Sequence, residues 1–394
     1  MRVVIIGPGR IGCGYLAPVF REAGWEVILA ARNTVAVSRI RRAGGFDIRV
    51  TGATPSVKTF TGVEAVAVGA GEFDEAIAHS DLVCTAVGVS NVSTLASPLA
   101  RAISGRLGGP LDVWVVENAD CAPLLARGVR AQAGNPLGEI GFAGAVATAV
   151  VARGGWGDSS CPVFVGDMPR RLYVDQRPLK SQVPLPNGVE LTDSYLARLA
   201  EKLYGFNSAH AICAYLGWLR GHRTIDQAVA DPFLRPMVAG CLLESSRALA
   251  AAHPQLGLDP EAAAAEAMRR FSNVELADPI SRVAREPNRK LAAGDRLLGA
   301  VALIRATRRL PSYFSLAIAS ALLYRHPDDV AALELGERLT RQGLRSVLRE
   351  LCGLEDGDHF ADAVERHYRS FVFTDDETLF PPVYDGLLLS QGVD

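Results

Sequence analysis

The sequence predicts an α/β chain in two parts: an N-terminal doubly wound, largely parallel sheet (residues 1–188) and a mostly α-helical C-terminal domain (residues 189–394). Three observations lead to this prediction. Short apolar runs alternate with helix-length stretches in the first part, as in a parallel sheet covered on both faces. A proline-rich segment then interrupts the chain. Beyond it, the composition is rich in Ala, Leu, Arg and Glu with helical periodicity, and 394 residues are enough for two domains.

The individual elements follow from these patterns. In the first part, we expect strands at 2–6, 26–31, 82–86 and 113–116. The interrupting segment 177–188 contains three prolines and ends in Asn-Gly, which predicts a linker or turn. In the second part, the periodicity predicts helices that include 242–252, 260–271 and 297–309.

Charge and hydropathy exclude two classes of partner. The formal net charge is −2, from 41 basic and 43 acidic residues, which argues against nucleic-acid binding through bulk positive charge. The apolar run Val3–Ile6 is too short to span a membrane and stops at Gly7, and it does not resemble a signal peptide. We therefore expect a cytoplasmic protein whose partner is a small-molecule substrate, and we weakly favour a monomer.

The cysteine pattern argues against disulfides and metal. The seven cysteines are odd in number and scattered, and no two have C-x-x-C spacing. This is typical of reduced thiols in the cytosol. Structural zinc sites need clustered ligands, so we expect no metal.

A glycine-rich turn lies between the first predicted strand and a helix-length stretch. It reads Gly7-Pro-Gly9-Arg10-Ile11-Gly12, a G-x-G-x-x-G pattern. The three glycines permit a tight turn, close backbone approach to a pyrophosphate and close packing of helix on strand. In this context the pattern predicts a Rossmann-type dinucleotide site, with the phosphates at the N-terminus of the helix.

The residues after the second strand indicate which dinucleotide is bound. NAD-specific folds usually carry an acidic residue there, whereas this chain has Ala31 followed by Arg32. An arginine can pair with a 2′-phosphate, so we expect NADP(H) to be preferred over NAD(H). The alternative is that Arg32 stacks on the adenine or points to solvent.

The stretch 201–211 contains Lys202, Asn207 and His210 in the spacing K-x4-N-x2-H. On an α-helix, Asn207 lies about 140° and His210 about 80° around the axis from Lys202, and about 12 Å of axis separates Lys202 from His210. All three can border one broad face. A desolvated lysine could remove or return a hydroxyl proton near neutral pH, while Asn207 and His210 donate hydrogen bonds to the carbonyl oxygen. Taken alone, such a triplet more often has a structural role.

Several segments together resemble the polyol-specific long-chain dehydrogenases, and most of all their mannitol-1-phosphate 5-dehydrogenase branch. The matching segments are Gly7–Leu16, Thr85–Gly88, Glu117–Asp120, Lys202–Ile225 and Arg285–Leu297. The resemblance implies an NAD(P)-dependent oxidoreductase that needs no metal and transfers a hydride between nicotinamide and a polyol or ketose (phosphate). It implies Lys202 as the acid/base, Asn207 and His210 as its partners, and Asn118 as a further group of the oxyanion site.

The resemblance also extends the expected cofactor and substrate sites. Thr85 and Val87 end the strand beside the nicotinamide, and Glu117 precedes the Asn118 of the family's Glu-Asn pair. Arg285, Arg289 and Lys290 form a basic segment that could meet a substrate phosphate, or could pair with Glu286 and Asp295.

The sequence departs from this branch where the branch usually carries an Asp-Arg pair, because it has Thr148-Ala149. This departure puts the hexitol-phosphate substrate in doubt. It keeps open a reductase of the same scaffold that acts on another polar carbonyl compound in a specialised biosynthetic pathway. A non-catalytic dinucleotide-binding protein is the remaining alternative.

Overall fold

The computed structural model describes residues 1–373 except 53, 107, 134–138, 158–160 and 168–170. It divides into two compact units, Met1–Leu199 and Ala200–Asp394, which are described separately below. None of the helices in the described ranges is both long and apolar enough to cross a membrane.

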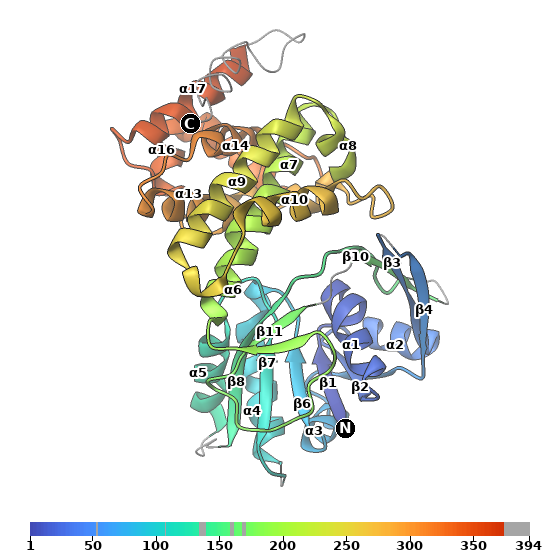
Figure 1. Cartoon of the computed structure of the whole chain (residues 1–394). Helices are drawn as coiled ribbons and strands as arrows, with labels where there is room; N and C mark the ends of the chain where they lie inside the picture. The colour runs from blue at the N-terminus through green and yellow to red at the C-terminus, as the bar shows by residue number, and fades with distance from the viewer. Residues whose placement is uncertain (53, 107, 134–138, 158–160, 168–170, 374–394) are drawn as a thin grey trace. The chain divides into compact units, whose positions relative to one another are not determined.

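The first unit is built on an eight-stranded sheet in the order β12-β11-β8-β7-β6-β1-β2-β5 (Figure 1). All neighbours pair in parallel except β11 and β8. The chain runs from β1 to β2 on one side and returns to β6 on the other, so the carboxyl end of β1 is a topological switch point. The strands are β1 Arg2–Ile6, β2 Glu26–Ala31, β5 Glu64–Ala67, β6 Leu82–Thr85, β7 Leu111–Val115, β8 Ile140–Ala147, β11 Leu172–Asp175 and β12 Val189–Thr192.

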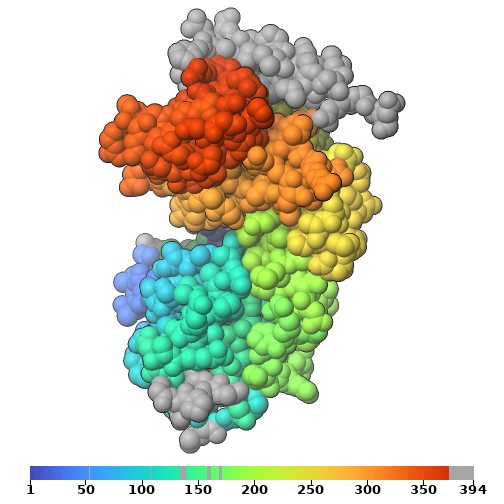
Figure 2. Space-filling model, turned by 90° about the vertical axis from the view of Figure 1, so that its left-hand side faces the viewer, coloured from blue at the N-terminus to red at the C-terminus, as the bar shows by residue number. Residues whose placement is uncertain are grey.

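Helices cover both faces of this sheet because its central strands are apolar on both sides. Val3 and Ile5 of β1 face the core beneath η1 (Gly12–Leu16), α1 (Ala17–Glu22) and α2 (Thr34–Ala43). Val4 and Ile6 face the opposite core beneath α3 (Gly71–Ala78), α4 (Ala96–Ser104) and α5 (Ala122–Ala133). Figure 2 shows the outer surface of α4 and α5 in teal.

A second, four-stranded sheet in the order β4-β3-β10-β9 lies within the same unit, and the sequence analysis did not predict it. Its strands are β3 Gly45–Thr51, β4 Ser56–Thr61, β9 Val151–Arg153 and β10 Val163–Asp167. Phe46 contacts the rings of Phe60, Phe164 and Trp156 at centroid distances of 5.5, 5.6 and 5.8 Å. This aromatic cluster joins the small sheet to the larger core.

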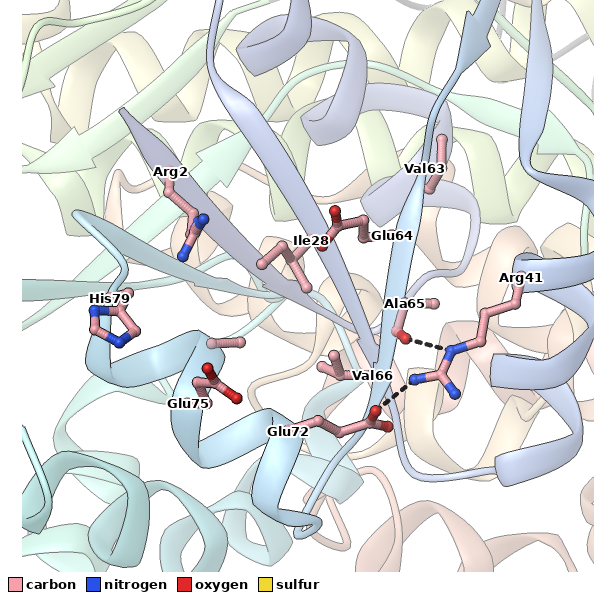
Figure 3. Close-up of a pocket in the computed structure, with 11 residues that line it drawn as sticks. Arg2, Ile28, Arg41, Val63, Glu64, Ala65, Val66, Glu72, Glu75 and His79 are labelled. Carbon is pink, nitrogen blue, oxygen red and sulfur yellow. Dashed lines mark hydrogen bonds and ion pairs between the residues drawn. The ribbon is translucent and has the colours of Figure 1, made fainter.

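The edge strand β5 of the large sheet is closed by side chains (Figure 3). Arg41 donates from Nε to the backbone oxygen of Ala65 at 2.8 Å, and Glu72 accepts from the backbone nitrogen of Ala67 at 3.2 Å. The two side chains also pair with each other at 2.6 Å. Two backbone groups of this edge strand that could pair with another strand are thus satisfied within the chain.

The second unit is helical. The core helices α7 (Ser208–Leu219) and α14 (Ser312–Leu323) are buried along almost their whole length. Around them lie η3 Glu201–Asn207, α8 Ile225–Ala230, α9 Leu234–Ala252, η4 Pro254–Leu256, α10 Pro260–Phe271, α11 Ile280–Ala284, α12 Pro287–Leu291, α13 Arg296–Ala306, α15 Val330–Gln342, α16 Leu344–Glu350 and α17 His359–Phe373. The remaining elements belong to the first unit: η2 Val89–Leu95 and α6 Tyr195–Ala200, whose last residue opens the second unit.

The predicted fold class is confirmed: a Rossmann-type sheet with helices is followed by a mostly helical region. The strands predicted at 2–6 and 26–31 and the helix predicted at 260–271 have the observed bounds. Segment 177–188 is irregular, as predicted, but it connects β11 to β12 inside the first unit. The predicted boundary after residue 188 therefore precedes the last strand of the sheet.

Candidate functional site

The glycine turn follows β1 at the switch point of the large sheet. Gly7 has φ of 103°, and a Cβ there would lie 2.4 Å from the backbone oxygen of Ala86. A Cβ on Gly12 would lie 2.1 Å from the backbone oxygen of Gly7. Both positions therefore require glycine for reasons internal to the chain. Gly9 differs, because a Cβ there would meet no atom within 4 Å. The space over Gly9 fits a group from outside the chain, such as a pyrophosphate.

The helix after the turn is not a regular α-helix. It starts with a π-helical segment, η1, before α1 continues it. Pro8 of the turn accepts a hydrogen bond from the indole Nε1 of Trp156 at 2.7 Å. Since Trp156 belongs to the aromatic cluster of the small sheet, that sheet supports the glycine turn. Arg10 and Ile11 are half-buried.

The loop after β6 is held by a buried carboxylate. Glu117, only 7% exposed, accepts hydrogen bonds from the backbone nitrogens of Val87 at 2.7 Å and Gly88 at 3.0 Å. The Thr85 side chain is fully buried at the end of β6. Both oxygens of Glu117 accept from the backbone, so this side chain holds the shape of the loop after β6. Val87 is half-buried, and Asn118 in the next loop is exposed.

Arg32 lies just beyond the end of β2, as predicted, and its side chain reaches the segment after β6. Its guanidinium donates to Thr94 Oγ1 at 3.1 Å and to Asn91 Oδ1 at 2.7 Å. Asn91 in turn donates to the backbone oxygen of Val87 at 2.9 Å. The arginine is thus oriented toward the carboxyl ends of β1, β2 and β6, where dinucleotides bind in this fold.

In the second unit, the Lys202-Asn207-His210 motif begins in a π-helix. Segment η3 contains Lys202 and Asn207, and α7 then contains His210. The α-helical geometry used for the prediction is therefore wrong between Lys202 and Asn207. A π-helix bonds residues five apart, which brings these two residues closer to one face than the α-helical angle implied. Lys202 and Asn207 are half-buried, and His210 is 7% exposed. Single π-helical turns are frequent at functional sites.

His210 makes contacts that the sequence did not reveal. Its Nε2 lies 3.2 Å from Oδ2 of Asp278, whose carboxylate also pairs with Arg282. The ring stacks on Phe271 at 5.0 Å between centroids and meets Phe206 edge-on at 5.6 Å. Burial lowers the pKa of His210, while the hydrogen bonds from His210 and Arg282 lower the pKa of Asp278 to about 2, against its burial.

The basic segment is engaged largely by its own neighbours. Arg289 pairs with Glu286 at 3.0 Å and with Asp295 at 3.5 Å, the structural alternative raised above. Lys290 is 3% exposed, donates to the backbone oxygen of Arg285 and has a pKa well below its ordinary value because of burial. The side chain of Arg285 is exposed.

Three other features bear on the site: the distribution of metal-ligating side chains, the contacts of Thr148 and a surface hollow. Among the residues that the structure describes, no group of three or more His, Cys, Asp or Glu side chains could hold a metal ion. Thr148, at the position of the missing Asp-Arg pair, bonds the backbone of Arg171 through its hydroxyl at 3.2 Å. A surface hollow of about 540 Å³ opens beside β5 and α3 and is lined by residues such as Arg2, Glu64 and His79 (Figure 3). It does not include the glycine turn.

A doubly wound sheet with a G-x-G-x-x-G turn at its switch point defines a dinucleotide-binding protein of the dehydrogenase class. Two family models agree: the mannitol dehydrogenase Rossmann domain matches residues 1–126, and the mannitol dehydrogenase C-terminal domain matches residues 193–372. The chain belongs to the mannitol dehydrogenase family. It is an oxidoreductase that acts on CH–OH groups with a nicotinamide cofactor.

Solved structures share the fold. The chain is similar to the mannitol 2-dehydrogenase of Pseudomonas fluorescens, solved as a ternary complex with NAD and D-mannitol (TM-score 0.78, 16% identity, covering 100% of this chain and 95% of that one). It is also similar to a D-sorbitol dehydrogenase in substrate-free form (TM-score 0.64, 14% identity, covering 92% of this chain and 94% of that one).

Proposed function

We propose that this chain interconverts a polyol and its ketose, with Lys202 as the general acid/base and with no metal. The observation that carries the proposal is the placement of Lys202 and Asn207 on one π-helical turn that leads into the buried His210. Such a turn presents an amine and an amide that can both address one substrate oxygen.

The reaction moves one hydride and one proton, and Lys202 exchanges the proton. The nicotinamide, when bound, supplies or accepts the hydride. In reduction, the Lys202 ammonium donates a proton to the carbonyl oxygen as the C–H bond forms, and the product is the alcohol. In oxidation, the neutral amine removes the hydroxyl proton. The amide nitrogen of Asn207 donates a hydrogen bond to the same oxygen and stabilises its developing charge, a role we also propose for Asn118.

We propose that the cofactor is held by Gly7, Gly9, Arg10, Ile11 and Gly12, with Val87 and Thr85 ending the strand beside it and Glu117 shaping the loop. NADP(H) is proposed over NAD(H), since Arg32 is oriented by Asn91 and Thr94 and no acidic residue ends β2. A guanidinium at this place can bind a 2′-phosphate.

The substrate class is a polyol or ketose, with or without a phosphate. Arg285 is the member of the basic segment most available to a phosphate, because Arg289 is ion-paired and Lys290 is buried. A different polar carbonyl compound of a specialised pathway is the second candidate. It is supported by Thr148, whose hydroxyl bonds the backbone where the family branch usually carries an Asp-Arg pair. We still expect a cytoplasmic monomer. The hydrogen bonds of Arg41 and Glu72 at the β5 edge support the monomer, because they disfavour the addition of a strand from another chain.

One screen tests this proposal. Ketoses, ketose phosphates, polyols, polyol phosphates and polar carbonyl compounds without neighbouring hydroxyls are offered with NADPH and NADH, and the nicotinamide absorbance is followed. We expect turnover on at least one ketose–polyol pair, faster with NADPH. Turnover only on carbonyl compounds that lack neighbouring hydroxyls would favour the second candidate. Cofactor binding without turnover on any compound would favour a non-catalytic dinucleotide-binding protein.

A further inference from the structure

His210 is held in one orientation by aromatic rings and a carboxylate. Phe271 stacks on the imidazole with an interplanar angle of 15°, and Phe206 contacts its edge at 62°. Nε2 points to Oδ2 of Asp278 at 3.2 Å. The His210 side chain keeps only 9% of its surface exposed and Asp278 only 2%, so neither can rotate freely into water.

Asp278 is in turn fixed by Arg282, four residues on. Nε of Arg282 donates to Oδ1 at 2.6 Å, and a terminal nitrogen of Arg282 donates to Oδ2. A two-pronged guanidinium keeps a carboxylate ionised and oriented. An ionised carboxylate only accepts hydrogen bonds, so the proton on the shared contact belongs to Nε2 of His210.

Burial favours a neutral His210 ring and is the main reason why the pKa of His210 is lowered. Asp278, which precedes α11, favours the imidazolium, whereas Arg282 of α11 and Arg270 of α10 oppose it. Arg270 lies 4.2 Å from the centre of the Phe206 ring. A neutral imidazole with a proton on Nε2 has a lone pair on Nδ1.

We propose that Asp278 is a positioning residue that locks His210 in the Nε2–H tautomer, so that Nδ1 accepts a hydrogen bond from a substrate hydroxyl beside the reacting carbon. This rests on the proposed polyol–ketose function. It replaces the donor role that the sequence suggested for His210, since a neutral ring bound to Asp278 through Nε2 has no second N–H to give. The consequence is selectivity: a substrate that lacks a hydroxyl next to its carbonyl leaves Nδ1 unpaired.

The chain contains a matched control for this arrangement. Asp231 of the same unit accepts hydrogen bonds from Nε2 of His222 at 2.9 Å and from Nε of Arg220 at 3.0 Å. This trio repeats the chemistry of His210, Asp278 and Arg282 without any residue of the proposed catalytic motif. Asp231→Asn should cost stability comparably but leave turnover within about twofold of the wild type.

Histidine tautomers are tested directly by ¹⁵N NMR on the full-length wild-type protein labelled at histidine, with His210→Gln identifying the His210 signals. From about pH 6 to about pH 9, we expect a protonated Nε2 and an unprotonated Nδ1. Asp278→Asn should give mixed tautomers, because an amide can donate or accept. A charged ring, or a proton on Nδ1, in the wild type overturns the proposal even if no Asp278 variant folds.

Kinetics test the consequence. Asp278→Asn should lower kcat/KM for the polyol at least about tenfold with unchanged cofactor affinity. The fold-loss in kcat/KM should be larger for substrates with a hydroxyl next to the reacting carbon than for substrates without one. A loss below about twofold, or an equal loss for both kinds of substrate, contradicts the positioning role. Unchanged turnover of Lys202→Ala would instead refute the proposed mechanism while leaving the NMR result valid.

Discussion

Glu117 bridges two successive backbone amides, with Oε1 2.7 Å from the nitrogen of Val87 and Oε2 3.0 Å from that of Gly88. Glu117→Gln replaces one acceptor oxygen by a donor that faces an N–H group. We expect a loss of about 1–3 kcal/mol in the free energy of unfolding and weaker cofactor binding, because the loop after β6 loses its support. Urea denaturation and a cofactor titration measure both quantities. The exposed Glu75 gives the control, Glu75→Gln, and equal behaviour of the two variants would contradict this role.

Trp156 couples the small sheet to the glycine turn through its hydrogen bond to Pro8. Trp156→Phe keeps an aromatic ring in the cluster but removes that bond. We expect the dissociation constant of the cofactor to rise about fivefold, equivalent to about 1 kcal/mol, with little change in kcat. Trp218→Phe, in the helical unit, is the control. A cofactor affinity that does not change would mean that the turn needs no such support.

Arg32 should decide the choice of cofactor. Arg32→Ala removes the guanidinium that Asn91 and Thr94 orient, so the ratio of kcat/KM for NADPH to that for NADH should fall at least about tenfold. The loss should arise mainly in the KM for NADPH. Arg42→Ala, an exposed change on α2, should leave the ratio unaltered. A wild-type enzyme that prefers NADH would already contradict this prediction.

Glu244 should make stability depend on pH. Its carboxylate accepts from the backbone nitrogen of Ser312 at 2.8 Å, yet burial raises its pKa from 4.5 to about 7. The folded state therefore binds the proton more tightly than the unfolded state, so this group's stabilising contribution is complete below about pH 4.5 and is lost as pH rises through about 7.

Glu244→Gln keeps a neutral acceptor and removes this titration. Relative to the wild type, the variant should gain stability between pH 5 and pH 8, with most of the gain complete near pH 7. Thermal unfolding midpoints of both proteins across this range measure the difference. Glu334→Gln, on the exposed face of α15, should show no such gain. A difference in unfolding midpoint between Glu244→Gln and the wild type that stays constant across this pH range would contradict the titration of Glu244.

The parts of the fold that could be predicted depend on local patterns. The apolar runs of β1 and β2 and the helix α10 were predicted with their observed bounds, since periodicity is a local pattern. The small sheet was missed, although Phe46, Ile48 and Val50 alternate along β3. That alternation could have been found, but the partner strand β10 lies more than a hundred residues away.

The candidate site was predictable only in its residue types. Lysine, asparagine and histidine could be read from their spacing, but the π-helical turn could not, because local sequence does not distinguish it from an α-helix. Asp278 has an i,i+4 partner in Arg282, which the sequence displays, whereas its contact with His210 depends on packing between distant helices. For Lys290, the sequence left open a substrate phosphate contact or pairing with Glu286 and Asp295. Its burial depends on tertiary packing and could not be predicted from either alternative.

The role of Lys202 is the central claim, and single-turnover kinetics with Lys202→Ala test it most directly. Loss of the group that exchanges the hydroxyl proton should lower the hydride-transfer rate at least about a hundredfold, with cofactor affinity unchanged and with partial rescue by added primary amines. Lys180→Ala, an exposed lysine of the first unit, should behave as the wild type. A hydride-transfer rate for Lys202→Ala within about twofold of the wild type would contradict the account.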